Sequence, residues 1–123
     1  MDLDKNSAVG IGLKETEGKI MMNEIWWDFI KEQAKAMTIS KQSGKYPPQN
    51  WRNPIDPHEL LASLERHSME VKIALQENKP ELLVDPTDGV DHLVKLALNA
   101  SMLQYQLVHH YIFTKKKKNS NTN

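Results

Sequence analysis

The fold is decided by one stretch of the sequence, DPHELLASLERHSMEVKIALQ at residues 56–76. Its apolar residues recur every three or four positions, which is the period of one face of an α-helix. Asp56 suits the N-cap and Pro57 the first helical position, because proline lacks the backbone N–H that is unpaired there anyway. Asn78 and Pro80 then end the pattern. The stretch predicts an amphipathic helix from Asp56 to about residue 76.

Two more helical patterns flank this stretch. The first covers residues 21–39, where apolar side chains again follow helical spacing. The second starts after Pro86, with Thr87 or Asp88 as its cap, and continues to about Phe113. Because no convincing strand pattern is present, we expect an all-α fold with three main helices.

The apolar residues of the last helix occupy more than one of its sides, with Val94 and Leu98 beside Leu93 and Leu103. Three helices of unequal length do not close a deep core, so we expect a homodimer or higher oligomer in which helices pair into four-helix bundles.

The chain divides into three parts on composition. Residues 1–19 form a polar N-terminal arm, residues 20–114 a helical domain, and residues 115–123 a basic and polar tail that we expect to be disordered.

Composition excludes several classes of protein. The chain has 123 residues, 16 basic and 16 acidic, but four of the lysines lie at positions 115–118, so the remainder carries a net charge of −4. A generally basic surface for specific nucleic-acid binding is therefore not expected. The chain has no cysteine and no long apolar run, which disfavours disulfides, thiolate metal sites and a membrane span. We expect a small, soluble protein of the cytoplasm.

The connection between the first two helices has the composition of a nucleotide-binding loop. It carries two cations, two aromatic rings and an amide: Lys45, Tyr46, Asn50, Trp51 and Arg52. Lysine and arginine contact phosphates, aromatic rings stack on bases, and an amide can read a base edge. The same aromatic residues and prolines could instead form a small core of the loop itself.

Polar residues also follow helical spacing on the second and third helices. His67 and Glu70 share a face of the second helix, and Asp88, His92 and Lys95 begin a polar stripe that ends at Asn99. An unpaired buried polar group costs about 1–3 kcal/mol, so two such stripes are expected to face each other across a polar cleft.

The carboxylates around this cleft are the kind of ligand that Mg²⁺ takes, and a carboxylate with imidazole suits Mn²⁺. The carboxylates that could serve such a metal site are Glu70, Asp85, Asp88 and Asp91. These polar side chains also have ordinary structural interpretations. Asp88 could do no more than cap a helix, Glu70 could lie in solvent, and His67 could be a structural residue of the helix.

Four motifs resemble a known family when taken in order. They are GLKETEGK at 12–19, GKYPPQNW at 44–51, LLASLERH at 60–67 and DPTDGVDHL at 85–93. Together they resemble the phage dATP/dGTP diphosphohydrolases, which are related in architecture to the all-α, MazG-like nucleotide pyrophosphohydrolases. The resemblance covers about residues 12–107.

The resemblance implies a purine nucleotide pocket in a helical bundle, where Mg²⁺ activates a water that attacks a dNTP and releases pyrophosphate. Carried onto this chain, it implies catalytic, metal-binding and substrate-binding groups. The catalytic groups are Glu70, Asp88 and His92, and the metal ligands Glu70, Asp85 and Asp88. The substrate contacts are Lys45, Tyr46, Asn50, Trp51, Arg52, Arg66, His67 and Lys95. A phage-type protein would act in the host cytoplasm.

The chain also departs from the family pattern. Thr87 and Asp88 stand where the family has Glu-Ser, and Lys95 stands where a second histidine is expected. A cation in place of a metal ligand favours phosphate binding without a metal. The alternative function is therefore a catalytically inactive nucleotide sponge that sequesters a host defence signal, and a third is a purely structural helical adaptor.

Overall fold

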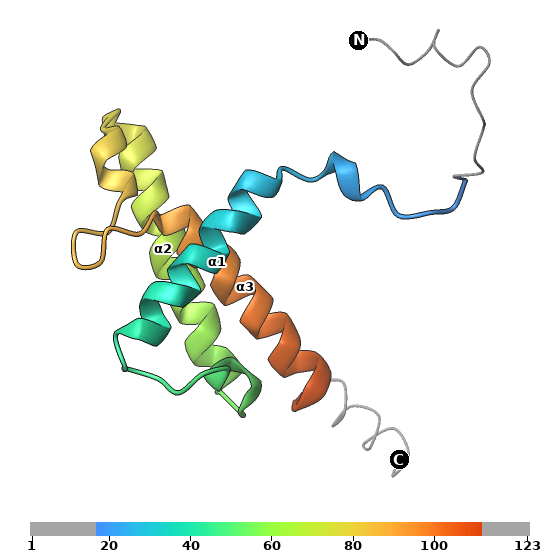
Figure 1. Ribbon diagram of the computed structural model, residues 1–123. Coiled ribbons are helices and arrows are strands. Elements are labelled where there is room, and N and C mark those ends of the chain that lie inside the picture. The colour runs from blue at the N-terminus through green and yellow to red at the C-terminus, as the bar shows by residue number, and fades with distance from the viewer. Residues whose placement is uncertain (1–16, 112–123) are drawn as a thin grey trace, which may run out of the picture.

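The computed structural model describes residues 17–111, and the regular secondary structure of this part of the chain is helical, apart from one isolated bridge between Val84 and Asp91. The long helices are α1 (Trp27–Gln42), α2 (Pro57–Glu77) and α3 (His92–His109). Short 3₁₀ turns are η3 (Met22–Glu24), η4 (Asn50–Arg52) and η5 (Pro80–Leu83). The all-α expectation with three main helices is confirmed (Figure 1). The expectations for residues 1–16, for the lysine tail and for Phe113 lie outside the described residues.

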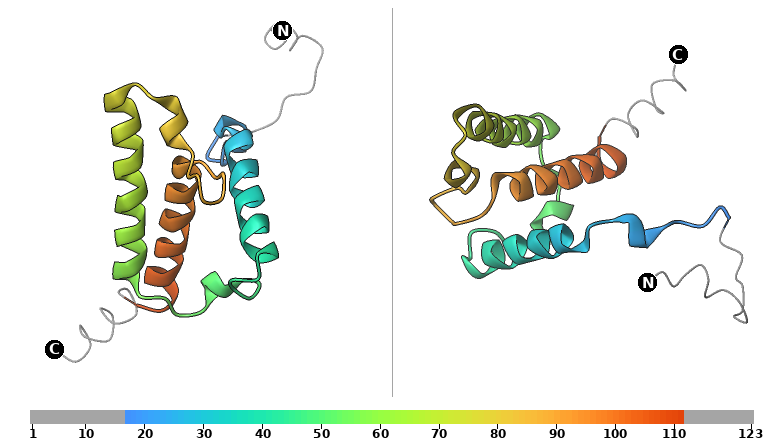
Figure 2. Two further views of the ribbon diagram at one scale, coloured as in Figure 1. Left: turned by 90° about the vertical axis from the view of Figure 1, so that its left-hand side faces the viewer. Right: turned by 90° about the horizontal axis from the view of Figure 1, so that it is seen from above.

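α3 lies between the other two long helices and contacts both of them. α2 and α3 run in opposite directions and pack along most of their length, and α1 packs on α3 from another side (Figure 2). The connection between α1 and α2 crosses the end of the bundle at which α3 finishes. Because α1 contacts α3 less extensively than α2 does, α1 is anchored less firmly than the α2–α3 pair.

α2 has the ends that its sequence predicts. The side chain of Asp56 accepts a hydrogen bond from the His58 amide at 2.9 Å, and Pro57 is the first helical residue. Asn78 ends the helix in the left-handed conformation with φ 55°, which asparagine tolerates better than most residues. Its amide then satisfies carbonyls of the last turn.

α1 begins later than expected, at Trp27 instead of residue 21. Ile25 and Trp26 have extended backbones, and Trp26 offers no side-chain cap. The Trp27 indole N–H instead donates to the carbonyl of Met22 at 3.0 Å, which folds η3 back against the start of α1. The apolar spacing continues through this break, which is why periodicity alone placed the start too early.

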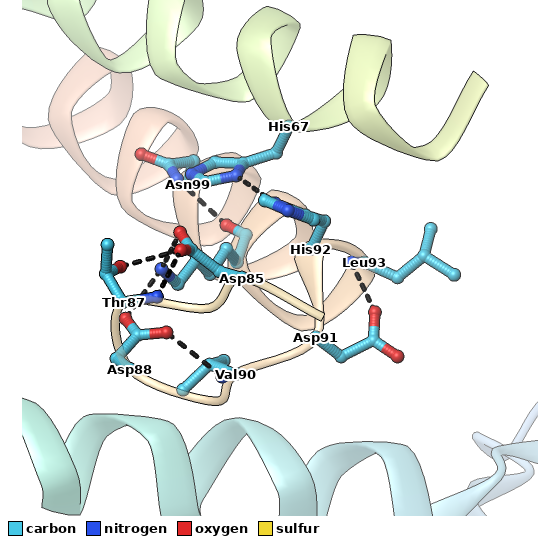
Figure 3. Close-up of polar contacts among 10 residues, drawn as sticks. His67, Asp85, Thr87, Asp88, Val90, Asp91, His92, Leu93 and Asn99 are labelled. Carbon is cyan, nitrogen blue, oxygen red and sulfur yellow. Dashed lines mark hydrogen bonds and ion pairs between the residues drawn. The ribbon is translucent and has the colours of Figure 1, made fainter. Parts of the chain in front are cut away.

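α3 also begins later than expected, and its cap is Asp91 and not Thr87 or Asp88. The Asp91 side chain accepts from the Leu93 amide at 2.7 Å, while Asp88 accepts from the Val90 amide at 3.0 Å within the preceding loop. Gly89 has φ +73°, which a helix does not allow. These local hydrogen bonds compete with helix formation, so residues 85–90 form a tight loop (Figure 3).

The described chain has a thin core. The buried apolar residues of residues 17–111 are Leu60, Ala74 and Val94, whereas many large apolar side chains stay exposed. The expected four-helix-bundle assembly is not shown by this single chain. Among the helices that the structure describes, none is long and apolar enough to cross a membrane.

One buried polar side chain fixes the long connection between α1 and α2. Gln106 on α3 is 0% exposed, and its amide nitrogen donates to the carbonyls of Trp51 and Asn53 at 2.8 and 2.7 Å. Its amide oxygen accepts from the Ile55 N–H at 3.0 Å. Three backbone groups of the connection therefore find their partners in one residue of α3.

Candidate functional site

A cleft lies over α3, between α1 and α2. Its larger part has a volume of about 980 Å³ and is lined by α1, by the connection at residues 46–51, by α2 and by Asn99 and Met102 of α3. Its smaller part, about 430 Å³, lies towards the loop at residues 85–90. The two parts share lining residues from α1, the connection and α3: Met37, Ser40, Tyr46, Asn99 and Met102. They are therefore two ends of one cleft.

The larger end is rich in aromatic and apolar surface. Tyr46 is about half exposed, and the Trp51 ring packs edge-on against Tyr105 with ring centroids 5.1 Å apart. Lys45 lies over the Tyr46 ring at 5.4 Å. Both ring surfaces belong to the connection that Gln106 fixes, so the loop is ordered and its Trp51 is also part of a small aromatic cluster.

The smaller end contains an ion cluster of one lysine and two aspartates. The Lys95 ammonium lies 2.8 Å from an Asp85 oxygen and 2.6 Å from an Asp88 oxygen. Hydrogen bonds from Lys95 and Thr87 hold the pKa of Asp85 well below its ordinary value. Burial alone would lower the pKa of Lys95, but its bonds to Asp85 and Asp88 outweigh burial and raise it. Asp85 and Lys95 are therefore both charged at neutral pH, and the formal charges of the one lysine and two aspartates sum to −1.

Two histidines join α2 to α3 beside this cluster. Nδ1 of His67 lies 3.0 Å from Nδ1 of His92, and His92 is only 6% exposed (Figure 3). One ring must donate and the other accept, so the pair cannot hold two protons on these nitrogens. Burial, followed by electrostatic repulsion from His92, Lys95 and Arg66, lowers the pKa of His67.

Most of the expected substrate contacts line the cleft. Asn50, Trp51 and Arg66 lie at the larger end, Lys45, His67 and Lys95 at the smaller end, and Tyr46 at both. Arg52 lines neither end; it is exposed and stacks on the outer surface of Trp51 with its guanidinium 5.0 Å from the ring. Its carbonyl instead contacts His110.

The expected metal-binding and catalytic groups are brought together only in part. Asp88 lines the smaller end and Asp85 lies beside it, because both contact Lys95. His92 lies behind His67, and Glu70 is exposed on α2 and lines neither end of the cleft. Within residues 17–111, no three His, Asp or Glu side chains are placed to hold a metal ion. The residues present do not fit the expected Mg²⁺ site, because Lys95 already occupies the space between the two aspartates.

Sequence reasoning missed two residues of the site. Gln106 lies seven positions after Asn99 and continues the polar stripe of α3, so its burial could have been inferred from spacing. Lys41 lines the larger end from α1, one turn after Met37, and no motif marks it.

Helices around a polar and aromatic cleft define the described part of this molecule, residues 17–111, as an all-helical protein with a cleft between its long helices. The chain belongs to the family described as dATP/dGTP diphosphohydrolase, N-terminal, which matches residues 10–116. The family resemblance read from the four motifs is thereby confirmed. None of the curated proteins and none of the solved structures matches the chain significantly.

Proposed function

We propose that the cleft binds a purine deoxynucleoside triphosphate and that the protein hydrolyses it to the monophosphate and pyrophosphate. The observation that carries this proposal is the composition of one continuous cleft. Aromatic rings, amides and three charged side chains line its larger end, and an imidazole and three charged side chains line its smaller end. The description of the family names the same reaction class and two purine deoxynucleotides.

In this proposal, the base lies against Tyr46 and Trp51, with Asn50 and Asn99 available to its polar edge. Aromatic stacking contributes about 1–3 kcal/mol per base. Lys45 is near enough to Tyr46 to meet the sugar or a phosphate on the side of the smaller end.

His67 is the proposed proton acceptor. Its Nδ1 is engaged by His92, and Nε2 makes no hydrogen bond within residues 17–111. A water would attack the α-phosphate, its proton would go to His67, and the bond to the β-phosphate would break. His92 is then a positioning residue for the His67 ring. Asp88 orients either the attacking water or the Lys95 ammonium. Glu70 has no role in this proposed reaction because it lies outside the cleft. Because residues 17–111 offer no fitting metal site, no step is assigned to Mg²⁺.

The test is product analysis. Purified protein is mixed with dATP, dGTP, dCTP or dTTP, with Mg²⁺, with Mn²⁺ or with EDTA, and the nucleotides are separated by chromatography. We expect the monophosphate and pyrophosphate from dATP or dGTP, and His67→Gln should abolish turnover. If no nucleotide is turned over under any condition, the hydrolase proposal is wrong.

One observation favours a second function, which is capture of a nucleotide without hydrolysis. Lys95 neutralises part of the charge of Asp85 and Asp88, the two carboxylates that were expected to bind a metal or take part in hydrolysis. Calorimetric titration would then show stoichiometric binding, and the ligand recovered afterwards would be intact. Recovery of a cleaved ligand contradicts this second candidate.

We also propose that the chain self-associates through its N-terminal apolar surface, which we define as the exposed large apolar side chains of residues 20–30. They are Ile20, Met21, Met22, Ile25, Trp26, Trp27 and Ile30. With ~200 Å² for a large side chain, their exposed fractions amount to ~800 Å², which is about what each partner of a standard interface buries. A second copy of this chain is the proposed occupant.

A further inference from the structure

The cations around the cleft differ in whether a carboxylate of the chain already pairs with them. Lys95 contacts two aspartates at 2.8 and 2.6 Å, so a phosphate would meet a cluster with a net charge of −1. Lys45 lies over the Tyr46 ring. Because two carboxylates already pair with it, Lys95 is poorly suited to be the main phosphate contact, although the sequence suggested it as one.

Two other cations of the cleft are unpaired. Lys41 lines the larger end from α1, and Arg66 lines it from α2. Neither side chain makes a hydrogen bond or an ion pair with any part of the chain that the structure describes, residues 17–111. One carboxylate, Glu59, also lines this end, so two cations face one anion there.

Their positions put the two charges on different walls of the cleft. α1 and α2 lie on different sides of α3 (Figure 2). Asn99 and Met102 of α3 line the cleft between α1 and α2. An anion held by both side chains would join α1, the less firmly anchored helix, to the α2–α3 pair. Both cations are exposed to solvent, so a bound anion would replace water at both of them.

We propose that Lys41 and Arg66 form a two-walled clamp for the phosphate chain of the bound nucleotide, and that Lys95 is the internal cation of the 85–90 loop and does not contact the ligand. This inference rests on the proposed nucleotide binding and deepens it. Arginine binds phosphate oxygens through a planar pair of donors, and lysine adds a mobile point charge. The clamp thus recognises the polyphosphate, whereas the aromatic surface recognises the base.

The test is calorimetric titration of the full chain with dATP, dGTP and inorganic tripolyphosphate. The variants are Lys41→Ala and Arg66→Ala. The matched controls are Lys31→Ala on α1 and Lys72→Ala on α2, two exposed lysines that do not line the cleft. Each clamp variant should weaken nucleotide binding ~10-fold or more, because a hydrogen bond to a charged group contributes about 1.5–3 kcal/mol. The controls should change it less than about twofold, and circular dichroism should show unchanged helix content for all four.

The outcomes separate the clamp from the nucleotide proposal. If the wild type binds dATP or dGTP and the clamp variants bind as the controls do, the clamp is wrong and the nucleotide site stands. If the wild type binds tripolyphosphate through Lys41 and Arg66 but no nucleotide, the clamp is supported and the proposed function is wrong. If it binds neither compound, both are wrong.

Discussion

At the scale of single residues, Gln106 and Lys95 show that polar side chains set the shape of this cleft. Each is held by more than one partner, Gln106 by three backbone groups and Lys95 by two carboxylates. Helical spacing placed Lys95 on a polar stripe of α3 but missed Gln106, and it could not give the partners of either residue, because those come from loops whose conformation depends on the whole fold.

Replacement of Gln106 by leucine should destabilise the protein by about 2–4 kcal/mol, since it leaves buried backbone groups of the connection without partners. Urea unfolding followed by circular dichroism measures this. Gln104→Leu, an exposed position on the same helix, serves as the control and should change the free energy of unfolding by less than about 0.5 kcal/mol. Equal effects of the two substitutions would contradict the structural role of Gln106.

The ion cluster should give a defined dependence of stability on pH. The lowered pKa of Asp85 adds stability above its ordinary value of 3.8, and this is lost as the pH falls towards the lowered pKa. The raised pKa of Lys95 adds stability below its ordinary value of 10.5, which is lost as the pH rises through the raised pKa. Lys95→Met should therefore cost about 1–2 kcal/mol between these limits and less outside them. Urea unfolding at a series of pH values tests this, and a cost that is the same at pH 3 and pH 7 would contradict it.

At the scale of helices, α2 was predicted almost completely, whereas α1 and α3 both begin later than their periodicity indicates. α2 has a strong cap, a proline at its first position and a left-handed end, which are all local signals. The starts of the other two depend on η3 and on the 85–90 loop. Hydrogen bonds of side chains to nearby backbone decide such boundaries, and apolar spacing does not record them.

The histidine pair should make the α2–α3 contact sensitive to mild acid. The folded state lowers the pKa of His67 below its ordinary value of 6.5, so the unfolded state takes up a proton first. Stability is then full above pH 6.5 and decreases as the pH falls towards the lowered pKa. The groups that bear on this ring are His92, Lys95, Arg66 and Asp85.

The measurement is thermal unfolding between pH 5 and pH 8. The wild type should lose more stability across this range than His67→Gln does, and His58→Gln, an exposed histidine of the same helix, should behave as the wild type. An identical pH profile for the wild type and His67→Gln would mean that the pair does not couple the two helices to pH.

At the scale of the whole molecule, the thin core and the N-terminal apolar surface of the described residues are the observations behind the proposed self-association. We expect a dimer or higher oligomer in size-exclusion chromatography with light scattering. Trp26→Glu, at a position that is 71% exposed, should shift the protein towards the monomer. Leu75→Glu, 74% exposed but on α2, should not. A wild type that is monomeric at high concentration would contradict this proposal.

The sequence sufficed for the fold class, and most of the substrate contacts that it suggested do line the cleft, because helical spacing and the loop motif both report local chemistry. It could not predict that Lys95 is fully engaged, that Glu70 and Arg52 lie outside the cleft, or that Lys41 lines it. Those facts depend on how α1 is placed relative to α2, and no short motif encodes that placement.

The most direct test of the central claim uses the three tryptophans of the chain as reporters. Trp51 lines the cleft, whereas Trp26 and Trp27 lie in the N-terminal apolar surface. The measurement is titration with dATP or dGTP, followed through the three indole N–H signals in a proton–nitrogen NMR spectrum. We predict that the Trp51 signal shifts and saturates while the other two stay in place. An unchanged Trp51 signal, or shifts confined to Trp26 and Trp27, would contradict the cleft as a nucleotide site.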